Sequence, residues 1–397
     1  METATSTRVA RVSAVLREGE RVLPLELFFD LVFVLALTQC TALISDNPTW
    51  DGVVQGMLVL AVLWWSWTAY AWLTSVVDPE EGAVRIAIFA AMAAFLIVAL
   101  CVPEAFDDLA LTFAAAYAGV RFAQIALFLI ASGDDPALRK SVTGLAISTA
   151  IGVGLLVGAA FLDGVAQGAL WALALLLDMG GPYLFGAEGW KLVPGHFAER
   201  HGLIIIIALG ESIVAIGVGA EVGLDAGIVA AAVLGIGLAS AMWWVYFDVV
   251  ALVSARRLAR AEEGRERNEL ARDSYSYMHF VLVAGVILLA FGLKKVLGHV
   301  EDPLKVVPAF GLMGGLALYL LGHVAFRYRH IHTINRQRLG LALLLFALIP
   351  VALELPPLVI LALMNVLIWG MIVYETRSYG EGRARLRHER MVETPSG

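Results

Sequence analysis

The chain has few charged residues and few cysteines. Charged residues make up only 16% of its 397 positions, whereas 60% are hydrophobic and the mean hydropathy is +0.80. This composition leaves too little polar surface for a soluble globular protein. Cys40 and Cys101 are the two cysteines, and both fall within or at the end of apolar segments. They support neither a disulfide framework nor a thiolate metal site, and we interpret them as small buried apolar residues.

The sequence also lacks the common catalytic and nucleotide-binding motifs. It contains no P-loop, no dinucleotide glycine fingerprint, no HExxH and no GxSxG. No soluble domain is large enough to bind a nucleotide, so we do not expect ATP-driven transport by this chain alone. We predict no cofactor, no metal site and no nucleic-acid partner. The polar N-terminal residues do not resemble a cleaved signal peptide.

What the sequence does contain is a series of long apolar segments. About 20 apolar residues cross the roughly 30 Å of hydrocarbon in a bilayer. Twelve segments qualify, at 24–45, 51–76, 83–103, 108–132, 140–161, 165–186, 197–219, 226–252, 273–296, 304–327, 337–353 and 356–375. The segment at 337–353 is the shortest. The sequence therefore predicts an all-α, polytopic membrane protein embedded in a lipid bilayer.

Lysine and arginine are unevenly distributed between the two ends of these spans. If the N-terminus is inside, 24 of the 28 cations fall on the cytoplasmic side, three fall outside, and Arg121 lies within a span. Cytoplasmic loops are enriched in these residues. We therefore predict a protein of the inner (cytoplasmic) membrane with both termini in the cytoplasm.

The chain divides near its middle. We predict an N-terminal cytoplasmic segment (1–23), a first six-helix unit (24–186), a second six-helix unit (187–376) and a cytoplasmic tail (377–397). The second unit contains a charged loop at 254–272. We expect this loop to form a short surface helix with its arginines near anionic headgroups.

The two units share a weak internal similarity. Four sets of residues match in the same order, and the offset between the matched positions rises steadily from 172 to 202, as loop insertions in the second half would require. The matches pair Ala36, Leu37 and Gln39 with Ala208, Leu209 and Glu211; Trp64 and Trp65 with Trp243 and Trp244; Arg85 with His279; and Tyr117 and Arg121 with Tyr319 and His323. Six spans per unit make this a parallel repeat about an axis along the membrane normal.

Ionisable side chains gather in one layer of the predicted membrane. At 1.5 Å per residue, five of them lie roughly 9 to 10 Å from the inner surface. They are Asp30, Arg121, Asp178, His201 and His279. A buried arginine needs a carboxylate partner, and we predict Asp30 as the first choice for Arg121 and Asp178 as the second.

Two further carboxylates and an amide belong to the same helices. Glu26 lies one turn before Asp30 on the same face and could widen a cation-attracting mouth. Glu211 lies roughly 6 Å past the midplane, and the repeat pairs it with Gln39. A carboxyl at that depth suits the uptake of a proton or the coordination of a cation. The alternative is that these groups only lock helices together, and that His279 only packs.

Two motifs carry a family resemblance over nearly the whole chain. ELFFDLVFVLALTQ (26–39) and ERHGLIIIIALGES (199–212), with the paired tryptophans of the second span and the turn from Tyr117 to Arg121, resemble the bacterial low temperature requirement A family. The resemblance implies an integral membrane protein linked to growth in the cold, in a family without a settled biochemical activity.

A second resemblance is more distant. Phe28, Asp30 and Phe33 form an F-x-D-x-x-F pattern similar to the first-helix signature of the endolysosomal and bacterial potassium channels built from two six-helix repeats. In those channels the signature helices of both repeats line the pore. Here Arg200, His201 and Gly202 stand where the second copy would be.

These observations favour a secondary transporter or channel-like permease for an unknown ion or small solute. Its path would be lined by the first and seventh spans, with Asp30, Gln39 and Glu211 facing it. Two alternatives remain open. One is a membrane-embedded enzyme acting on a lipid or isoprenoid through Asp30, Asp178, His201 and His279, and the other is a non-catalytic membrane-adaptation protein. A homo-oligomer is compatible with each of them.

Overall fold

A computed structural model describes residues 21–133, 135–186, 188–219, 225–298 and 300–378. Over these ranges the regular structure is helical, and no strand occurs. Residues 1–20 of the predicted N-terminal segment and 379–397 of the predicted tail lie outside the described residues.

The first half consists of six long helices. They are α1 (Pro24–Asp46), α2 (Trp50–Thr74), α3 (Gly82–Cys101), α4 (Ala110–Ser132), α5 (Pro136–Ala159) and α6 (Gly164–Leu184). A short 3-10 turn, Val102–Glu104, follows α3. Side-chain caps help to define the starts of α2 and α5, where Thr49 and Asp135 accept hydrogen bonds from backbone N–H groups of the first turn.

The second half has five long helical segments and a shorter one, α14 with α15, and its segments have more interruptions. Its helices are α7 (Pro194–Gly219), α8 (Ala226–Phe247), α9 (Val250–Arg260), α10 (Arg265–Ala271), α11 (His279–Gly298), α12 (Val306–Ala309), α13 (Gly315–Ile331), α14 (Arg336–Ala347), α15 (Ile349–Ala352) and α16 (Pro357–Ser378). Two π-helical segments, Arg272–Met278 and Phe310–Gly314, lead into α11 and α13. Such wide turns recur at functional sites.

Eleven helical segments of the described residues are long and apolar enough to cross a membrane. They coincide with eleven of the twelve predicted spans, which confirms the polytopic fold. The twelfth prediction, 337–353, falls on α14 and α15. At 1.5 Å per residue, α14 is only about 18 Å long, and Pro350, which has no backbone N–H to donate, follows its end.

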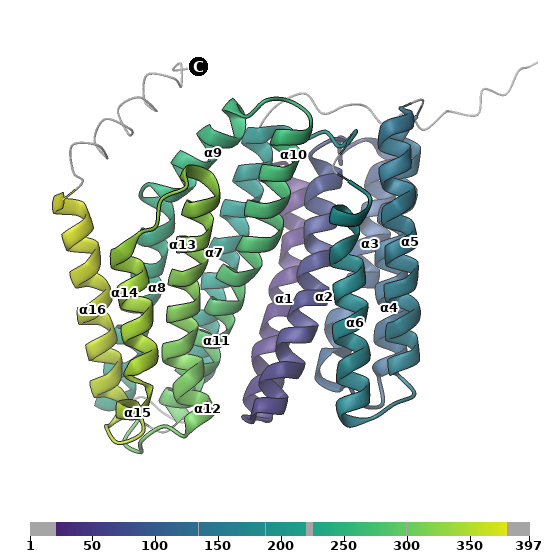
Figure 1. Cartoon of the computed structure of the whole chain (residues 1–397). Helices are drawn as coiled ribbons and strands as arrows, with labels where there is room; N and C mark the ends of the chain where they lie inside the picture. Colours follow the sequence, from purple (N-terminus) through teal and green to yellow (C-terminus); the bar gives the residue numbers. More distant parts are fainter. Residues whose placement is uncertain (1–20, 134, 187, 220–224, 299, 379–397) are drawn as a thin grey trace, which may run out of the picture.

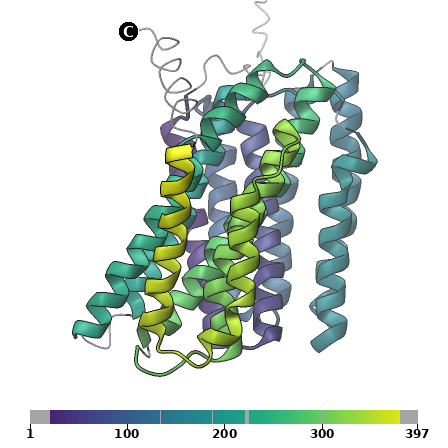
Figure 2. The same ribbon diagram turned by 60° about the vertical axis from the view of Figure 1, so that its left-hand side comes forward.

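The long helices run side by side across one slab (Figure 1). α1 begins and α16 ends on the same side of the bundle, the upper side in Figure 1, which we call the terminal face. α9 and α10 lie at this face, whereas α12 and α15 lie at the opposite one. Figure 2 shows the same arrangement from a second direction.

The two halves have the same order of helix packing. In the first half α1 packs on α2 and α3, α3 on α4, α4 on α5, and α2 on α6. In the second half α7 packs on α8 and α11, α11 on α13, α13 on α14, and α8 on α16. This is the order that a duplication of the chain would produce, although the duplication itself stays a prediction.

The halves meet along α1 and α2 on one side and α7 and α11 on the other. α2 and the segment containing α11 are the spans with the largest buried share. Trp64 and Trp67 of α2 are fully buried at this junction. The centre of the core is therefore the contact between the halves.

The charged loop at 254–272 contains two helices rather than the single surface helix predicted. α9 and α10 bury an apolar face that includes Leu258 and Leu270. These two leucines belong to a cluster with Phe197 of α7, Tyr275 of the π-helical segment Arg272–Met278 and Phe326 of α13. The loop thus covers the ends of second-half helices.

A close contact between α11 and the π-helical segment Phe310–Gly314 depends on glycine. A Cβ placed on Gly292 would lie 2.5 Å from the backbone N and Cα of Leu312. By contrast, a Cβ on Gly370 of α16 would meet nothing within 4 Å. Backbone atoms cannot move aside as a flexible side chain can, so only glycine fits at position 292 without a shift of the backbone.

We therefore expect Gly292→Ala to destabilise the protein by about 1 to 3 kcal/mol, as overpacking of a tight core does. Gly370→Ala is the matched control and should be neutral or slightly stabilising, because alanine favours helix more than glycine does. Thermal unfolding in detergent measures both. Equal transition temperatures for the two variants would contradict the packing described here.

Candidate functional site

Ionisable side chains from α1 and α7 meet between the two helices. Glu26 Oε1 lies 2.8 Å from Nε2 of His196 and 4.0 Å from Nη1 of Arg200. Arg200 Nη2 lies 3.0 Å from Oδ1 of Asp30. Each of these four residues is at most 2% exposed. We call them the charge cluster, and it lies near the terminal face because α1 and α7 both begin there.

The spacing of these residues explains why they meet. Glu26 and Asp30 are four positions apart, so they lie on one face of α1, and His196 and Arg200 are four positions apart on α7. The two helices run in the same direction. Both hydrogen-bonded pairs are separated by 170 residues in the chain. The two acids on α1 and the two basic residues on α7 have the same spacing. Both contacts therefore form at one alignment of the two helices.

A tryptophan from α2 completes the charge cluster. Trp67 Nε1 donates a hydrogen bond of 2.8 Å to Asp30 Oδ1, and the Arg200 guanidinium lies 5.5 Å from the centre of the Trp67 ring. Asp30 Oδ2 has no hydrogen-bond partner in the described part of the chain. The carboxylate is thus held on one oxygen only.

Charge counting shows what the cluster can do. Its members are two carboxylates, one guanidinium that stays protonated, and one imidazole that can exist in either state. With Glu26 and Asp30 ionised, these four groups carry a net charge of −1 when His196 is neutral and zero when it is protonated. A proton or a cation bound here would change that balance in a buried environment.

Glu211 forms a second polar contact between the same two helices. Thr38 Oγ1 donates a hydrogen bond of 2.7 Å to Glu211 Oε2, and Glu211 is 3% exposed. Gln39, which the repeat matches to Glu211, is the next residue along α1 and is half-buried, as Thr38 is. Because one residue corresponds to about 100° of helix rotation, Thr38 rather than Gln39 faces α7.

An apolar stretch separates Glu211 from the charge cluster. The eleven positions from Arg200 to Glu211 correspond to about 16 Å along α7. The side chains that fill this stretch are fully buried and apolar, namely Phe33, Ala36 and Leu37 on α1 and Ile204, Ile205 and Ala208 on α7. These apolar side chains therefore separate the charge cluster from Glu211.

The first-choice partner predicted for Arg121 is wrong, and the second choice is confirmed. Arg121 Nη2 lies 3.0 Å from Oδ1 of Asp178, whereas Asp30 pairs with Arg200. Asp178 also accepts hydrogen bonds from the hydroxyls of Tyr117 (2.8 Å) and Thr149 (2.7 Å). The prediction used only the depth of each residue in the membrane. The side of the helix from which each side chain extends decides which residues pair.

The two predicted histidines lie together. The ring centres of His201 and His279 are 5.2 Å apart. His279 Nδ1 lies 3.0 Å from the Ser274 carbonyl and must donate to it, so Nε2 accepts the hydrogen bond of 2.8 Å from the Tyr246 hydroxyl. By the same logic His201 Nδ1 donates to the Phe197 carbonyl at 2.8 Å. His201 Nε2 lacks a hydrogen-bond partner among the described residues.

The predicted layer is thus three separate groups and not one site. Asp30 belongs to the charge cluster, Asp178 to the Arg121 pair, and His201 and His279 to an aromatic enclosure that includes Trp67 and Tyr275. The four side chains required by the enzyme alternative are not joined by hydrogen bonds in the described chain. Nor do the described residues include a group of three or more histidines, cysteines or carboxylates arranged for a metal.

Sequence reasoning missed four members of these contacts. They are Thr38, Trp67, His196 and Arg200. One signal was available, because the spacing of histidine and arginine at the start of α7 repeats that of glutamate and aspartate at the start of α1. The complementary spacing of acids on one helix and bases on the other would have predicted the pairing.

A small pocket adjoins the charge cluster. It encloses about 210 Å³ of empty space, its mouth included, and its walls include Glu26, Phe29, Tyr70, Thr74 and Arg200. Glu26 and Arg200 thus line a cavity as well as pairing with one another.

Comparisons with known proteins agree with the resemblance noted in the sequence. The family model described as "Bacterial low temperature requirement A protein (LtrA)" matches residues 21–373, which confirms that resemblance. An uncharacterized protein of Rhizobium meliloti (strain 1021) is 30% identical over 309 residues, covering 75% of each chain. No solved structure matches the chain.

Removing the central guanidinium should destabilise the protein. Arg200→Gln leaves the carboxylates of Glu26 and Asp30 buried without their arginine, and breaking a buried ion pair in this way costs about 3 to 5 kcal/mol. The triple variant Glu26→Gln, Asp30→Asn, Arg200→Gln removes the charges together and should recover most of the loss. Thermal unfolding in detergent compares them, with the exposed Arg139→Gln as control. A single variant as stable as the control would contradict the pairing.

Proposed function

This chain belongs to the bacterial low temperature requirement A family of membrane proteins, and we propose that it is a secondary transporter or channel-like permease for an ion or small solute. In this proposal α1 and α7 line the path. The charge cluster forms a binding site near the terminal face, and Glu211 forms a second binding site farther along the path.

The main support is the position of the buried ionisable groups. Glu26, Asp30, His196, Arg200 and Glu211 all lie where the two halves of the molecule meet, and each is at most 3% exposed. Ionisable residues inside membrane-spanning segments are costly, and they often mark ion or substrate pathways. One ion pair between two helices needs only two such residues, whereas five lie along α1 and α7.

The arrangement corresponds to a closed path. The apolar stretch between Arg200 and Glu211 leaves no polar connection along the helix pair. Transporters built from two like-oriented halves operate by rocking one half against the other around a central site. A small relative movement of α1 and α7 would separate the side chains that now fill this stretch, and both binding sites lie on the helices that would move.

Charge balance suggests the nature of the coupling ion. The cluster can accept one proton on His196 or one cation beside Asp30, whose Oδ2 faces no described hydrogen-bond donor. Glu211 is held by the hydroxyl of Thr38, which can also accept a hydrogen bond if the carboxyl is protonated. We therefore favour a proton or a monovalent cation as the coupled ion.

The orientation and the biological setting are parts of the same proposal. The excess of lysine and arginine in the loops supports a terminal face in the cytoplasm and a location in the inner membrane. The pocket beside Glu26 and Arg200 would then be the cytoplasmic approach to the path. The words "low temperature requirement" in the family description support a role in the cold as a further part of this proposal.

Flux measurements test the proposal. The purified chain in proteoliposomes should carry protons, sodium or potassium down an imposed gradient, and Glu211→Gln should reduce that flux at least tenfold. Glutamine can still bond Thr38, so this variant should fold normally. Asp30→Asn should have the same effect on flux. Glu104→Gln, which changes an exposed carboxylate beyond α3, is the matched control.

Two outcomes would reject the proposal. One is flux that stays unchanged in both Asp30→Asn and Glu211→Gln, when size-exclusion profiles show that the variants are folded. The other is a wild-type protein that conducts none of the three ions under either sign of the membrane potential.

A further inference from the structure

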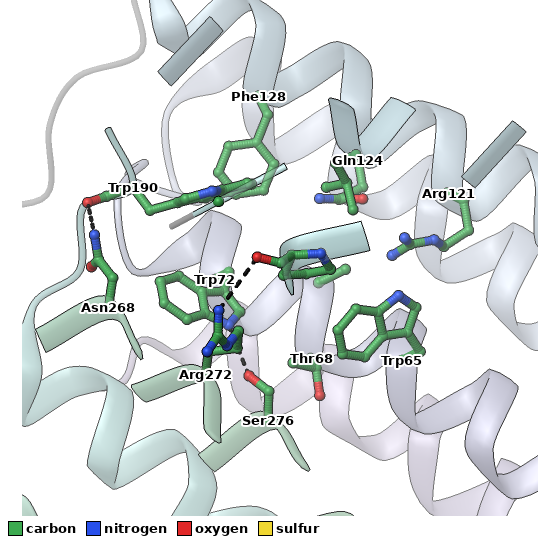
Figure 3. A pocket seen from close by; sticks show the side chains of 14 residues that line it. Trp65, Thr68, Trp72, Arg121, Gln124, Phe128, Trp190, Asn268, Arg272 and Ser276 are labelled. Carbon is green, nitrogen blue, oxygen red and sulfur yellow. Dashed lines mark hydrogen bonds between the residues drawn. The ribbon is translucent and has the colours of Figure 1, made fainter. Parts of the chain in front are cut away.

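A larger pocket lies away from the α1–α7 contact. It opens among α2, α4, α5, the end of α6, α10 and the π-helical segment Arg272–Met278 (Figure 3). It encloses about 530 Å³ of empty space, its mouth included.

Several polar atoms in its walls are buried without a partner. Nε and Nη1 of Arg121, both amide atoms of Gln124, Nε1 of Trp65 and Oγ1 of Thr68 make no hydrogen bond in the described part of the chain. Each of these residues is at most 5% exposed. Figure 3 shows Arg121 and Gln124 extending from the same helix near Trp65. Buried polar groups are normally hydrogen-bonded, so unpartnered groups in a cavity indicate an absent ligand or water.

The charges of the pocket favour an anion. Its lining contains two guanidinium groups, those of Arg121 and Arg272, and no carboxylate. Asp178 neutralises Arg121 through Nη2 only, which leaves its other donors available. At the mouth, Arg272 and Arg329 share the single carboxylate of Asp273. The local balance is therefore positive.

The remaining walls are aromatic. Trp65, Trp72, Phe128 and Trp190 line the cavity. Trp190 meets Phe128 edge-on with ring centres 5.0 Å apart, and it meets Trp72 in the same way at 5.9 Å. These contacts hold the rings in fixed positions. Flat apolar molecules bind between such surfaces through stacking and edge contacts.

We propose that this pocket binds a small aromatic carboxylate. The carboxylate would accept hydrogen bonds from Arg121 and from the amide of Gln124, and the ring would lie among Trp65, Trp72 and Trp190. The positive charge of Arg272 would attract the anion to the pocket. The proposal concerns binding alone and stands independently of ion flux through α1 and α7.

Tryptophan fluorescence can report occupancy directly, since three tryptophans line the pocket. The full chain in nanodiscs of neutral phosphatidylcholine is titrated with benzoate, 1-naphthoate and indole-3-acetate at pH 7, where all three are ionised. Equilibrium dialysis confirms the affinities. We expect at least one of them to bind saturably and at least ten times more tightly than its neutral amide of the same shape. If none binds better than its amide, the proposal is wrong.

Variants assign the binding to this pocket. Gln124→Leu removes an amide that has no protein partner, so it should leave the protein folded and weaken binding about tenfold. Arg272→Gln leaves Asp273 paired with Arg329 and should also weaken binding. Gln55→Leu, at a half-buried position near the start of α2 and outside the pocket lining, is the matched control and should bind as the wild type does. Affinities that are the same in all four proteins would overturn the assignment.

A second lipid composition separates a dissolved anion from a lipid headgroup. In nanodiscs containing anionic phosphatidylglycerol, a site for dissolved aromatic carboxylates should keep its affinity for the probe. If phosphatidylglycerol abolishes probe binding in the wild type, the occupant is an anionic lipid headgroup and the proposal fails.

Discussion

A guanidinium buried between two carboxylates governs how this bundle is assembled. Arg200 stays protonated and is only 1% exposed, so it is stabilised by remaining beside Asp30 and Glu26. These pairs set the register between α1 and α7, and through it the alignment of the two halves. The same register places Thr38 opposite Glu211 and leaves the apolar stretch between them closed. The proposed path and the packing of the halves therefore depend on one set of contacts.

The segment that leads into α11 lies between the larger pocket and the histidine pair beside the charge cluster. Ser276 belongs to the wall of the larger pocket, and it also accepts hydrogen bonds from Trp72 (3.0 Å, on Oγ) and Trp64 (2.6 Å, on the carbonyl). Two residues earlier, the Ser274 carbonyl holds His279. This π-helical segment thus touches the pocket on one side and the histidine pair beside the charge cluster on the other. A ligand that shifted this segment would therefore also move residues that contact α7.

The spans were predictable because length and hydropathy are local properties. The interrupted segment at α14 was foreseen as the shortest for the same reason. Side-chain partners were harder to predict: counting residues gives depth along a helix but not the direction a side chain faces, so Asp30 was wrongly assigned to Arg121. Thr38 was missed because a similarity between the halves pointed to its neighbour, Gln39. The larger pocket could not be predicted, since its walls come from six separate segments.

The 170 residues between Asp30 and Arg200 also bear on how the protein is made. A ribosome adds about 5 to 20 residues per second, so roughly 10 to 30 s pass between the synthesis of the two. During that interval the newly inserted first helix carries two carboxylates with no arginine to meet them. The contact between Asp30 and Arg200 can therefore form only after the seventh long helix has been made.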